Sequence, residues 1–110
     1  MTDTPQEMHP SNQRFFAGLD KMREISLRKQ KDYGSLADPF ANVRAGALEV
    51  GLEPWIGAVI RMGDKMRRIQ KAARLGPDSL DFDSVEDDLV DLANYSLIAK
   101  TLLEEATNAP

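Results

Sequence analysis

The hydrophobic residues of this chain recur at helical spacing in three long stretches. The first is predicted to begin with Ser11 as N-cap and to run to about Gln30. The second begins at Pro54 and stops at Gly76-Pro77, because proline suits a first turn and the Gly-Pro pair ends a helix. The third begins at Asp83 or Ser84, where Asp83 and Glu86 have capping-box spacing, and reaches about residue 105.

Each predicted helix carries apolar residues at steps of three and four, which is typical of packing on another helix. In chain order the three stripes are Phe15, Phe16, Leu19, Met22 and Ile25; Trp55, Val59, Met62, Met66, Ile69 and Ala73; and Val85, Leu89, Leu92, Ser96, Ala99 and Leu103. Stripes of this length favour association of copies through a helix face.

The segments between these helices are short. Gly34 closes the first helix, and Pro39 permits a short helix near residues 40–50. Residues 1–10 read as a flexible N-terminal arm. No stretch alternates with the period of a strand, so we expect one all-α domain over residues 11–106, a small helical bundle of three long helices plus a short one. We expect a homodimer or homotetramer.

Composition excludes several kinds of chemistry. The chain has 110 residues, 42% hydrophobic and 29% charged, with no cysteine and a single histidine, His9. The lack of cysteine rules out thiolate metal sites and cysteine nucleophiles. The single histidine leaves a Ser-His-Asp triad very poorly supported. No apolar run approaches the roughly 20 residues of a membrane span, and the N-terminus lacks signal-peptide features, so we expect a cytoplasmic protein with no membrane partner.

Charge is segregated along the chain. The net charge of −4 argues against a nucleic-acid partner. Six bases lie between residues 61 and 74, namely Arg61, Lys65, Arg67, Arg68, Lys71 and Arg74. Seven acids follow, namely Asp78, Asp81, Asp83, Glu86, Asp87, Asp88 and Asp91. The two segments either pair with each other or form a site for both a cation and an anion.

The acids of the last helix allow two interpretations. Asp87 and Asp91 are four residues apart, so both lie on one helix face, where they would repel unless a cation sits between them. Mg²⁺ suits such carboxylates, because it also keeps sites for phosphate oxygens. Alternatively Glu86, Asp87 and Asp88 only stabilise the N-terminal end of the helix dipole. That alternative is weaker for Asp91, which lies in the second turn.

Asp64 and its neighbouring bases also have two interpretations. Asp64 lies within helical reach of Arg61 and Arg68, so a surface ion-pair network would explain it. An antiparallel neighbour would instead bring Asp64 towards Asp91. Lys65 would then contact phosphate, or it simply solvates one helix face.

A basic cluster with an aromatic residue ends the first helix. Lys29 and Lys31 suit the negative end of the helix dipole, or they form a lip that binds phosphates while Tyr33 contacts a nucleobase. Glu24 either reaches the same centre or pairs with Arg28.

Four runs of residues together resemble one family: Lys31-Asp32-Tyr33-Gly34, Pro39-Phe40-Ala41-Asn42, Arg61-Met62-Gly63-Asp64-Lys65, and the run from Glu86 to Tyr95. Their order and spacing are similar to those of small, often phage-encoded, MazG-like proteins of the all-α nucleotide pyrophosphohydrolase superfamily. The resemblance covers roughly residues 20–105. It implies an oligomeric helical bundle, a Mg²⁺ site of helix-borne carboxylates, and cleavage of a nucleoside triphosphate to the monophosphate and pyrophosphate.

The resemblance also assigns site residues. Asp87 and Asp91 match the paired acids of the family's last metal-binding helix. Asp64-Lys65 matches an acid-base pair on the preceding helix of the family, and Tyr33-Gly34 matches the loop that approaches substrate. The substrate-binding candidates are Lys29, Lys31, Tyr33, Gly34, Asn42, Lys65 and Asn94. The Glu-Glu-x-x-Glu motif of better-known members is missing, so Glu24, Asp64 and Asp88 are candidates to complete the metal ligands, Asp64 first.

Residues and resemblance lead to one mechanism. Mg²⁺ held by Asp64, Asp87 and Asp91 would neutralise the triphosphate and position a water, with Asp64 and Asp91 as the catalytic pair. Lys65, Lys29 and Lys31 would steady the phosphates. Two other classes stay open: a nucleotide-binding module without catalysis, and a phage interaction protein that uses the basic helix.

Overall fold

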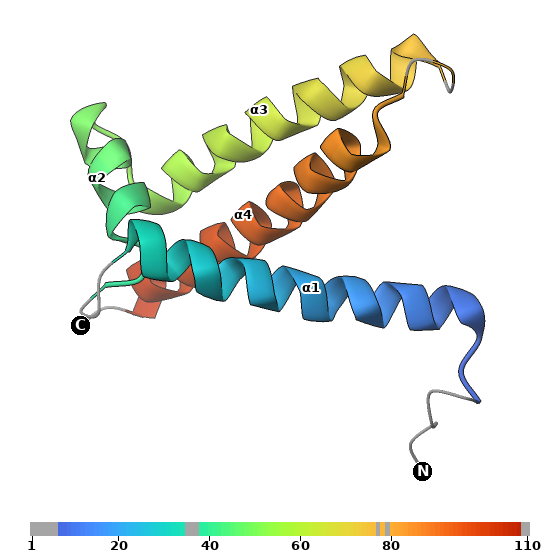
Figure 1. The fold of residues 1–110 in the computed structure, drawn as a ribbon. Coiled ribbons are helices and arrows are strands. Elements are labelled where there is room, and N and C mark those ends of the chain that lie inside the picture. The colour runs from blue at the N-terminus through green and yellow to red at the C-terminus, as the bar shows by residue number, and fades with distance from the viewer. Residues whose placement is uncertain (1–6, 35–37, 77, 79, 109–110) are drawn as a thin grey trace.

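The computed structural model describes residues 7–34, 38–76, 78 and 80–108, and within these ranges it contains helices and no strand. The elements are α1 (Pro10–Tyr33), α2 (Ala41–Glu49), α3 (Pro54–Leu75) and α4 (Phe82–Asn108), as Figure 1 shows. The predicted all-α class, with three long helices and a short one, is confirmed.

Proline and glycine set the ends of α3 as predicted. Pro54 occupies the first turn of α3, and the C-cap Gly76 has a φ of 83°, a left-handed value that favours glycine. The other half of the predicted stop signal, Pro77, lies outside the described residues. The short helix expected near residues 40–50 is α2.

The starts of α1 and α4 correct the prediction. Ser11 is not the N-cap: His9 Nδ1 accepts a hydrogen bond from the Ser11 amide at 3.0 Å, and Pro10 is already helical. At α4 the cap lies two residues before the predicted Asp83, since Asp81 Oδ1 accepts from the Ser84 amide at 3.3 Å. Of the predicted flexible arm, residues 1–6 lie outside the described residues.

The antiparallel pair α3 and α4 forms the body of the molecule (Figure 1). α2 packs on α3 at a close approach, where a Cβ at Gly57 would lie 2.9 Å from the Ala47 Cβ. α1 crosses α4 near its own C-terminal half, and its first turns project away from the α3–α4 pair (Figure 1). As a result Phe15 is 63% exposed, while Ile25, nearer the crossing, is half-buried.

The buried apolar core is small. Among the described residues its members are Ala47, Ala58, Ala99 and Leu102. The predicted stripes are covered only on one side: Met62 and Leu92 are half-buried, whereas Met66 is 41% and Leu89 50% exposed. A single chain therefore covers only part of the helical seams that its sequence encodes.

Candidate functional site

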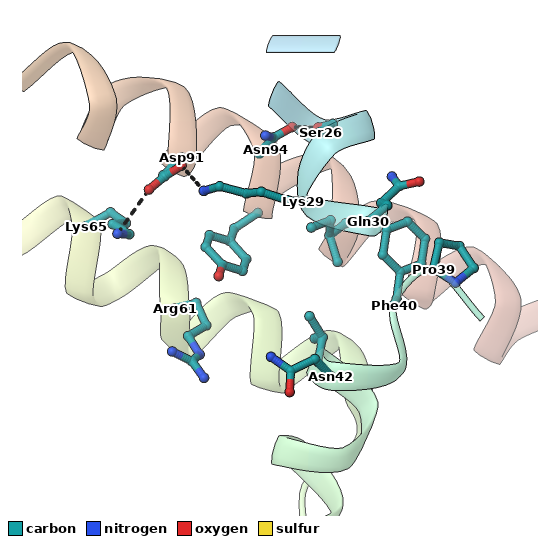
Figure 2. A pocket seen from close by; sticks show the side chains of 13 residues that line it. Ser26, Lys29, Gln30, Pro39, Phe40, Asn42, Arg61, Lys65, Asp91 and Asn94 are labelled. Atoms are coloured by element: carbon teal, nitrogen blue, oxygen red, sulfur yellow. Dashed lines mark hydrogen bonds and ion pairs between the residues drawn. The ribbon is translucent and has the colours of Figure 1, made fainter. Parts of the chain in front are cut away.

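A pocket of about 310 Å³ lies where all four helices meet (Figure 2). Its wall combines three bases with one carboxylate, several amides and two aromatic rings. The lining residues are Ser26, Lys29, Gln30, Pro39, Phe40, Asn42, Val43, Arg61, Lys65, Asp91, Asn94, Tyr95 and Ile98. An excess of bases in a partly enclosed space is suited to an anionic ligand.

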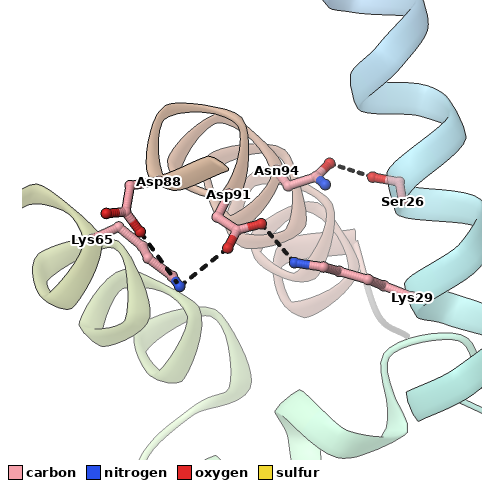
Figure 3. A network of polar contacts seen from close by, with 6 residues as sticks. All are labelled: Ser26, Lys29, Lys65, Asp88, Asp91 and Asn94. Carbon is pink, nitrogen blue, oxygen red and sulfur yellow. Dashed lines mark hydrogen bonds and ion pairs between the residues drawn. The ribbon is translucent and has the colours of Figure 1, made fainter. Parts of the chain in front are cut away.

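Asp91 is at the electrostatic centre of this pocket. Its Oδ1 accepts a hydrogen bond from Lys29 Nζ at 2.6 Å, and its Oδ2 lies 3.1 Å from Lys65 Nζ. The side chain is only 17% exposed. α1 and α3 thus each send one lysine to a single carboxylate on α4, as Figures 2 and 3 show.

These two lysines decide the protonation of Asp91. Burial raises the pKa of the carboxyl, but the hydrogen bonds and charges of Lys29 and Lys65 outweigh burial, and the pKa lies below its ordinary value of 3.8. Asp91 is therefore ionised at neutral pH and acts as an acceptor or a ligand.

Asp88 extends the network beneath the pocket. Its side chain is 7% exposed, and its two oxygens lie 4.0 Å from Lys65 Nζ and 3.3 Å from Arg68 Nε. Since Asp88 and Asp91 are three residues apart on α4, both point to the same side and the Lys65 ammonium stands between them (Figure 3).

A second contact ties α1 to α4. The Ser26 hydroxyl donates to Asn94 Oδ1, and Asn94 is only 7% exposed (Figure 3). Lys29 is three residues after Ser26, so one face of α1 makes both contacts with α4. The α1 wall of the pocket is therefore fixed by polar contacts to Asp91 and Asn94.

Gly34 acts through packing. It is the C-cap of α1, and a Cβ built on it would lie 2.4 Å from the Pro39 carbonyl oxygen and 2.7 Å from that of Gln30. Because both are backbone atoms, a side chain at this position would push Pro39 and Phe40 away from the end of α1. Gly34 does not line the pocket, but it permits the close approach that shapes the wall beside it.

The structure brings together part of the predicted site. Five predicted residues line the pocket, namely Lys29, Asn42, Lys65, Asp91 and Asn94, and Asp88 joins them through Lys65.

The remaining predicted residues are not brought together with them. Asp64 is an exposed partner of Arg67, and Glu24 is an exposed partner of Arg28 at 3.8 Å. Asp87 and Lys31 are also exposed and do not line the pocket. The side chain of Tyr33 lies outside what the structure describes.

Sequence reasoning did not assign the aromatic part of the pocket. Tyr95 follows Asp91 by four residues, so helical spacing alone would have placed both on one face. Phe40 reaches the pocket only because α2 folds back on α3, and no local pattern indicates this.

The acids in the described part of the chain do not form a cluster of three or more potential metal ligands. The two that converge, Asp88 and Asp91, share the Lys65 ammonium. None of the described helices is long and apolar enough to cross a membrane. Comparison of the sequence with family models and with curated proteins, and of the structure with solved structures, finds no match. The resemblance to MazG-like proteins stays a prediction that rests on the four quoted runs.

Proposed function

We propose that the protein is a Mg²⁺-dependent nucleoside triphosphate pyrophosphohydrolase, whose active site is the pocket around Asp91. The observation that carries the proposal is the set of three bases, Lys29, Arg61 and Lys65, around one ionised carboxylate. The resemblance to MazG-like proteins supplies the reaction class.

The bases suit a polyphosphate. Lys29 and Lys65 lie within 3.1 Å of Asp91 and are mobile point charges on flexible stems, whereas Arg61 lines the pocket from the same helix as Lys65. A triphosphate offers them more negative charge than Asp91 alone. Both lysines would then exchange the carboxylate for phosphate oxygens, which favours binding of substrate.

The rest of the pocket lining suits the nucleoside. Phe40 and Tyr95 bring aromatic rings to the lining, on which a base would stack, and Gln30, Asn42 and Asn94 bring amides, which can donate and accept hydrogen bonds. Figure 2 shows Asn42 and Phe40 across the pocket from Asp91. Phosphates near Asp91 would leave the base near Asn42 and Phe40.

The donor set is compatible with one divalent cation. The carboxylates of Asp88 and Asp91 already flank a positive group, the Lys65 ammonium. Mg²⁺ is typically bound by one or two carboxylates together with substrate phosphates, so these two residues would hold it once Lys65 has turned to the phosphates. When bound, the ion would neutralise phosphate charge and lower the pKa of a water.

The chain's own residues supply the remaining steps. Cleavage adds the hydroxyl of a water to phosphorus, breaks the bond between the α- and β-phosphates, and releases one proton. Asp91 Oδ1, which Lys29 leaves on binding phosphate, accepts that proton. Lys29 and Arg61 stabilise the charge that develops on the leaving pyrophosphate.

Pyrophosphate release tests the proposal. Purified protein is incubated with Mg²⁺ and each common ribo- and deoxyribonucleoside triphosphate. We expect release with at least one of them, and a loss of about 100-fold or more in kcat for Asp91→Asn. Asp83→Asn, which makes the same charge change on the same helix outside the pocket, is the matched control and should keep its rate. No turnover of any nucleotide would contradict the proposal.

Asp64→Asn separates the two versions of the site. The sequence predicts Asp64 as the first added ligand, whereas Asp88 and Asp91 converge at the pocket. A rate within about twofold of wild type supports the pocket version, and a loss comparable with that of Asp91→Asn would move the site towards Asp64.

A nucleotide-binding module without hydrolysis is the second candidate. It is favoured by the lysines that neutralise Asp91 and by the lack of a third converging carboxylate in the described part of the chain. Calorimetric binding of a nucleotide to the same pocket without pyrophosphate release would favour this candidate.

A further inference from the structure

Three charged side chains that do not line the pocket meet where α2 begins. Arg44 on α2 is at their centre: its Nε lies 2.9 Å from Asp38 Oδ2, and its Nη2 donates to Glu105 Oε2 on α4 at 2.6 Å. The Arg44 side chain is 33% exposed, so both contacts are partly shielded from water. We call these three residues the Arg44 clamp.

The Arg44 clamp controls how α2 begins. The N-cap residue Phe40 makes no capping bond through its side chain. Asp38 supplies the acceptors instead: its Oδ1 accepts from the Phe40 amide at 3.0 Å, and its carbonyl oxygen accepts from the Ala41 amide at 3.3 Å. Because Arg44 contacts the other carboxylate oxygen of Asp38, a side chain within α2 fixes the residue that orders its first turn.

The segment that the clamp orders is part of the pocket. Pro39 and Phe40 line the pocket, and so do Asn42 and Val43. We call residues 39–43 the α2 wall; Asp38 directly precedes it and Arg44 directly follows it. Figure 2 shows this wall across the pocket from Asp91. The clamp therefore holds both ends of the wall on which the nucleoside of the proposed substrate would lie.

Glu105 ties the α2 wall to a second helix. α2 packs on α3, and the contact of Arg44 with Glu105 adds a link to the last turns of α4, 61 positions along the chain. Asp91 and Tyr95, further back on α4, line the pocket. A bridge between α2 and α4 thus sets the distance between the α2 wall and the part of the pocket that α4 supplies.

We propose that Arg44 is a positioning residue, which holds the α2 wall in place through Asp38 and Glu105 and so sets the affinity for the nucleoside end of the ligand. The bases that would hold the phosphates lie on α1 and α3 and are outside the clamp. The inference rests on the proposed nucleotide pocket but not on hydrolysis, so measurements of binding test it.

Titration calorimetry with two ligands separates the two ends of the pocket. The first ligand is the α,β-methylene analogue of the common nucleoside triphosphate that wild type binds most tightly, and it uses both the bases and the α2 wall. The second is inorganic tripolyphosphate, which uses the bases alone. Each half-exposed ion pair contributes up to about fivefold in an equilibrium constant. Arg44→Gln removes both pairs, so it should raise the dissociation constant of the nucleotide analogue about 5- to 25-fold and that of tripolyphosphate less than about twofold.

Two neighbouring glutamates give a matched pair of variants that leaves α2 unchanged. Glu105→Gln removes the α4 end of the clamp, whereas Glu104→Gln removes the same charge one residue earlier, where the partner is Lys100. Glu105→Gln should weaken binding of the nucleotide analogue about 2- to 5-fold, and Glu104→Gln should leave it unchanged. Arg44→Lys keeps the charge but offers one ammonium to two acids, so it should resemble Glu105→Gln rather than wild type.

Amide hydrogen exchange without ligand tests the clamp separately from the pocket. The amides of Phe40 and Ala41 should exchange about 5- to 25-fold faster in Arg44→Gln, because the α2 wall opens more often, while the amides of α3 keep their rates. Unchanged exchange at Phe40, an equal loss of both ligands in Arg44→Gln, or equal effects of Glu104→Gln and Glu105→Gln would each overturn the inference. A wild type that binds neither ligand would instead contradict the proposed function, and the exchange rates would still decide whether Arg44 holds the wall.

Discussion

The ion pair of Lys65 and Asp91 gives the sharpest test of the polar network in solution. Lys65 Nζ lies 3.1 Å from Asp91 Oδ2, and the side chains are only 22% and 17% exposed. Three variants examine the pair: Asp91→Asn, which keeps the shape of the side chain, Lys65→Met, which keeps most of the stem, and the double variant.

The magnitude follows from the burial of each partner. A largely buried, charge-assisted hydrogen bond contributes about 1.5–3 kcal/mol. The second partner of Asp91 is Lys29, whose side chain is 44% exposed. Because solvent screens this pair, the Lys29 contact contributes only about 0.5–1 kcal/mol. We therefore expect Asp91→Asn to lower the free energy of unfolding by about 2–4 kcal/mol and Lys65→Met by about 1.5–3 kcal/mol. The double variant should cost about 1.5–3 kcal/mol less than the sum.

Urea unfolding followed by circular dichroism measures all four proteins. Urea adds no ions that would screen the pair, and one protein concentration is used throughout. If the losses of the two single variants sum to the loss of the double variant within about 0.5 kcal/mol, the two groups do not interact, and the ion pair of Lys65 and Asp91 is refuted.

Two further predictions follow from the geometry. Gly34→Ala should lower the free energy of unfolding by about 1–3 kcal/mol and weaken nucleotide binding, because the added Cβ would lie 2.4 Å from a backbone atom. Gly18→Ala, inside α1 with nothing within 4 Å, should instead raise the free energy of unfolding by about 0.5–1 kcal/mol. Changes of the same sign in thermal unfolding would contradict the close approach at Gly34. Asp91 has a lowered pKa, so its contribution to stability is complete above pH 3.8 and is lost as the pH falls through the folded value. The stability gap between wild type and Asp91→Asn should accordingly be constant near neutral pH and close in acid, and a gap that persists in acid would refute this assignment.

The helices of this chain are well predicted where strong local signals exist. Pro54 and Gly76 delimit α3 as expected, because proline fixes φ at a value suited to the first turn and glycine adopts the left-handed φ at the C-cap, whatever surrounds them. The start of α1 was missed because His9 caps it through its ring nitrogen, and histidine is not among the preferred N-cap residues. The start of α4 moved because Asp81 offers the same capping group as Asp83 two residues earlier.

The site depends on rotations that the sequence does not specify. The sequence predicts that α3 brings Asp64 towards Asp91. In the structure Lys65, one residue and about 100° further round the helix, faces Asp91 instead. The contact of Lys29 with Asp91 joins residues 62 positions apart and depends on the angle at which α1 crosses α4. Bases of α3 and acids of α4 therefore pair with each other. Mutual pairing is one of the two arrangements that the segregated charges predict.

A crystal structure with Mg²⁺ and a non-hydrolysable nucleoside triphosphate analogue tests the central claim most directly. We predict that the phosphates lie among Lys29, Arg61 and Lys65, that Lys65 has left Asp88 and Asp91, and that the base lies near Phe40 and Tyr95. An empty pocket at saturating analogue, or phosphates bound to the exposed Arg67 instead, would contradict the account.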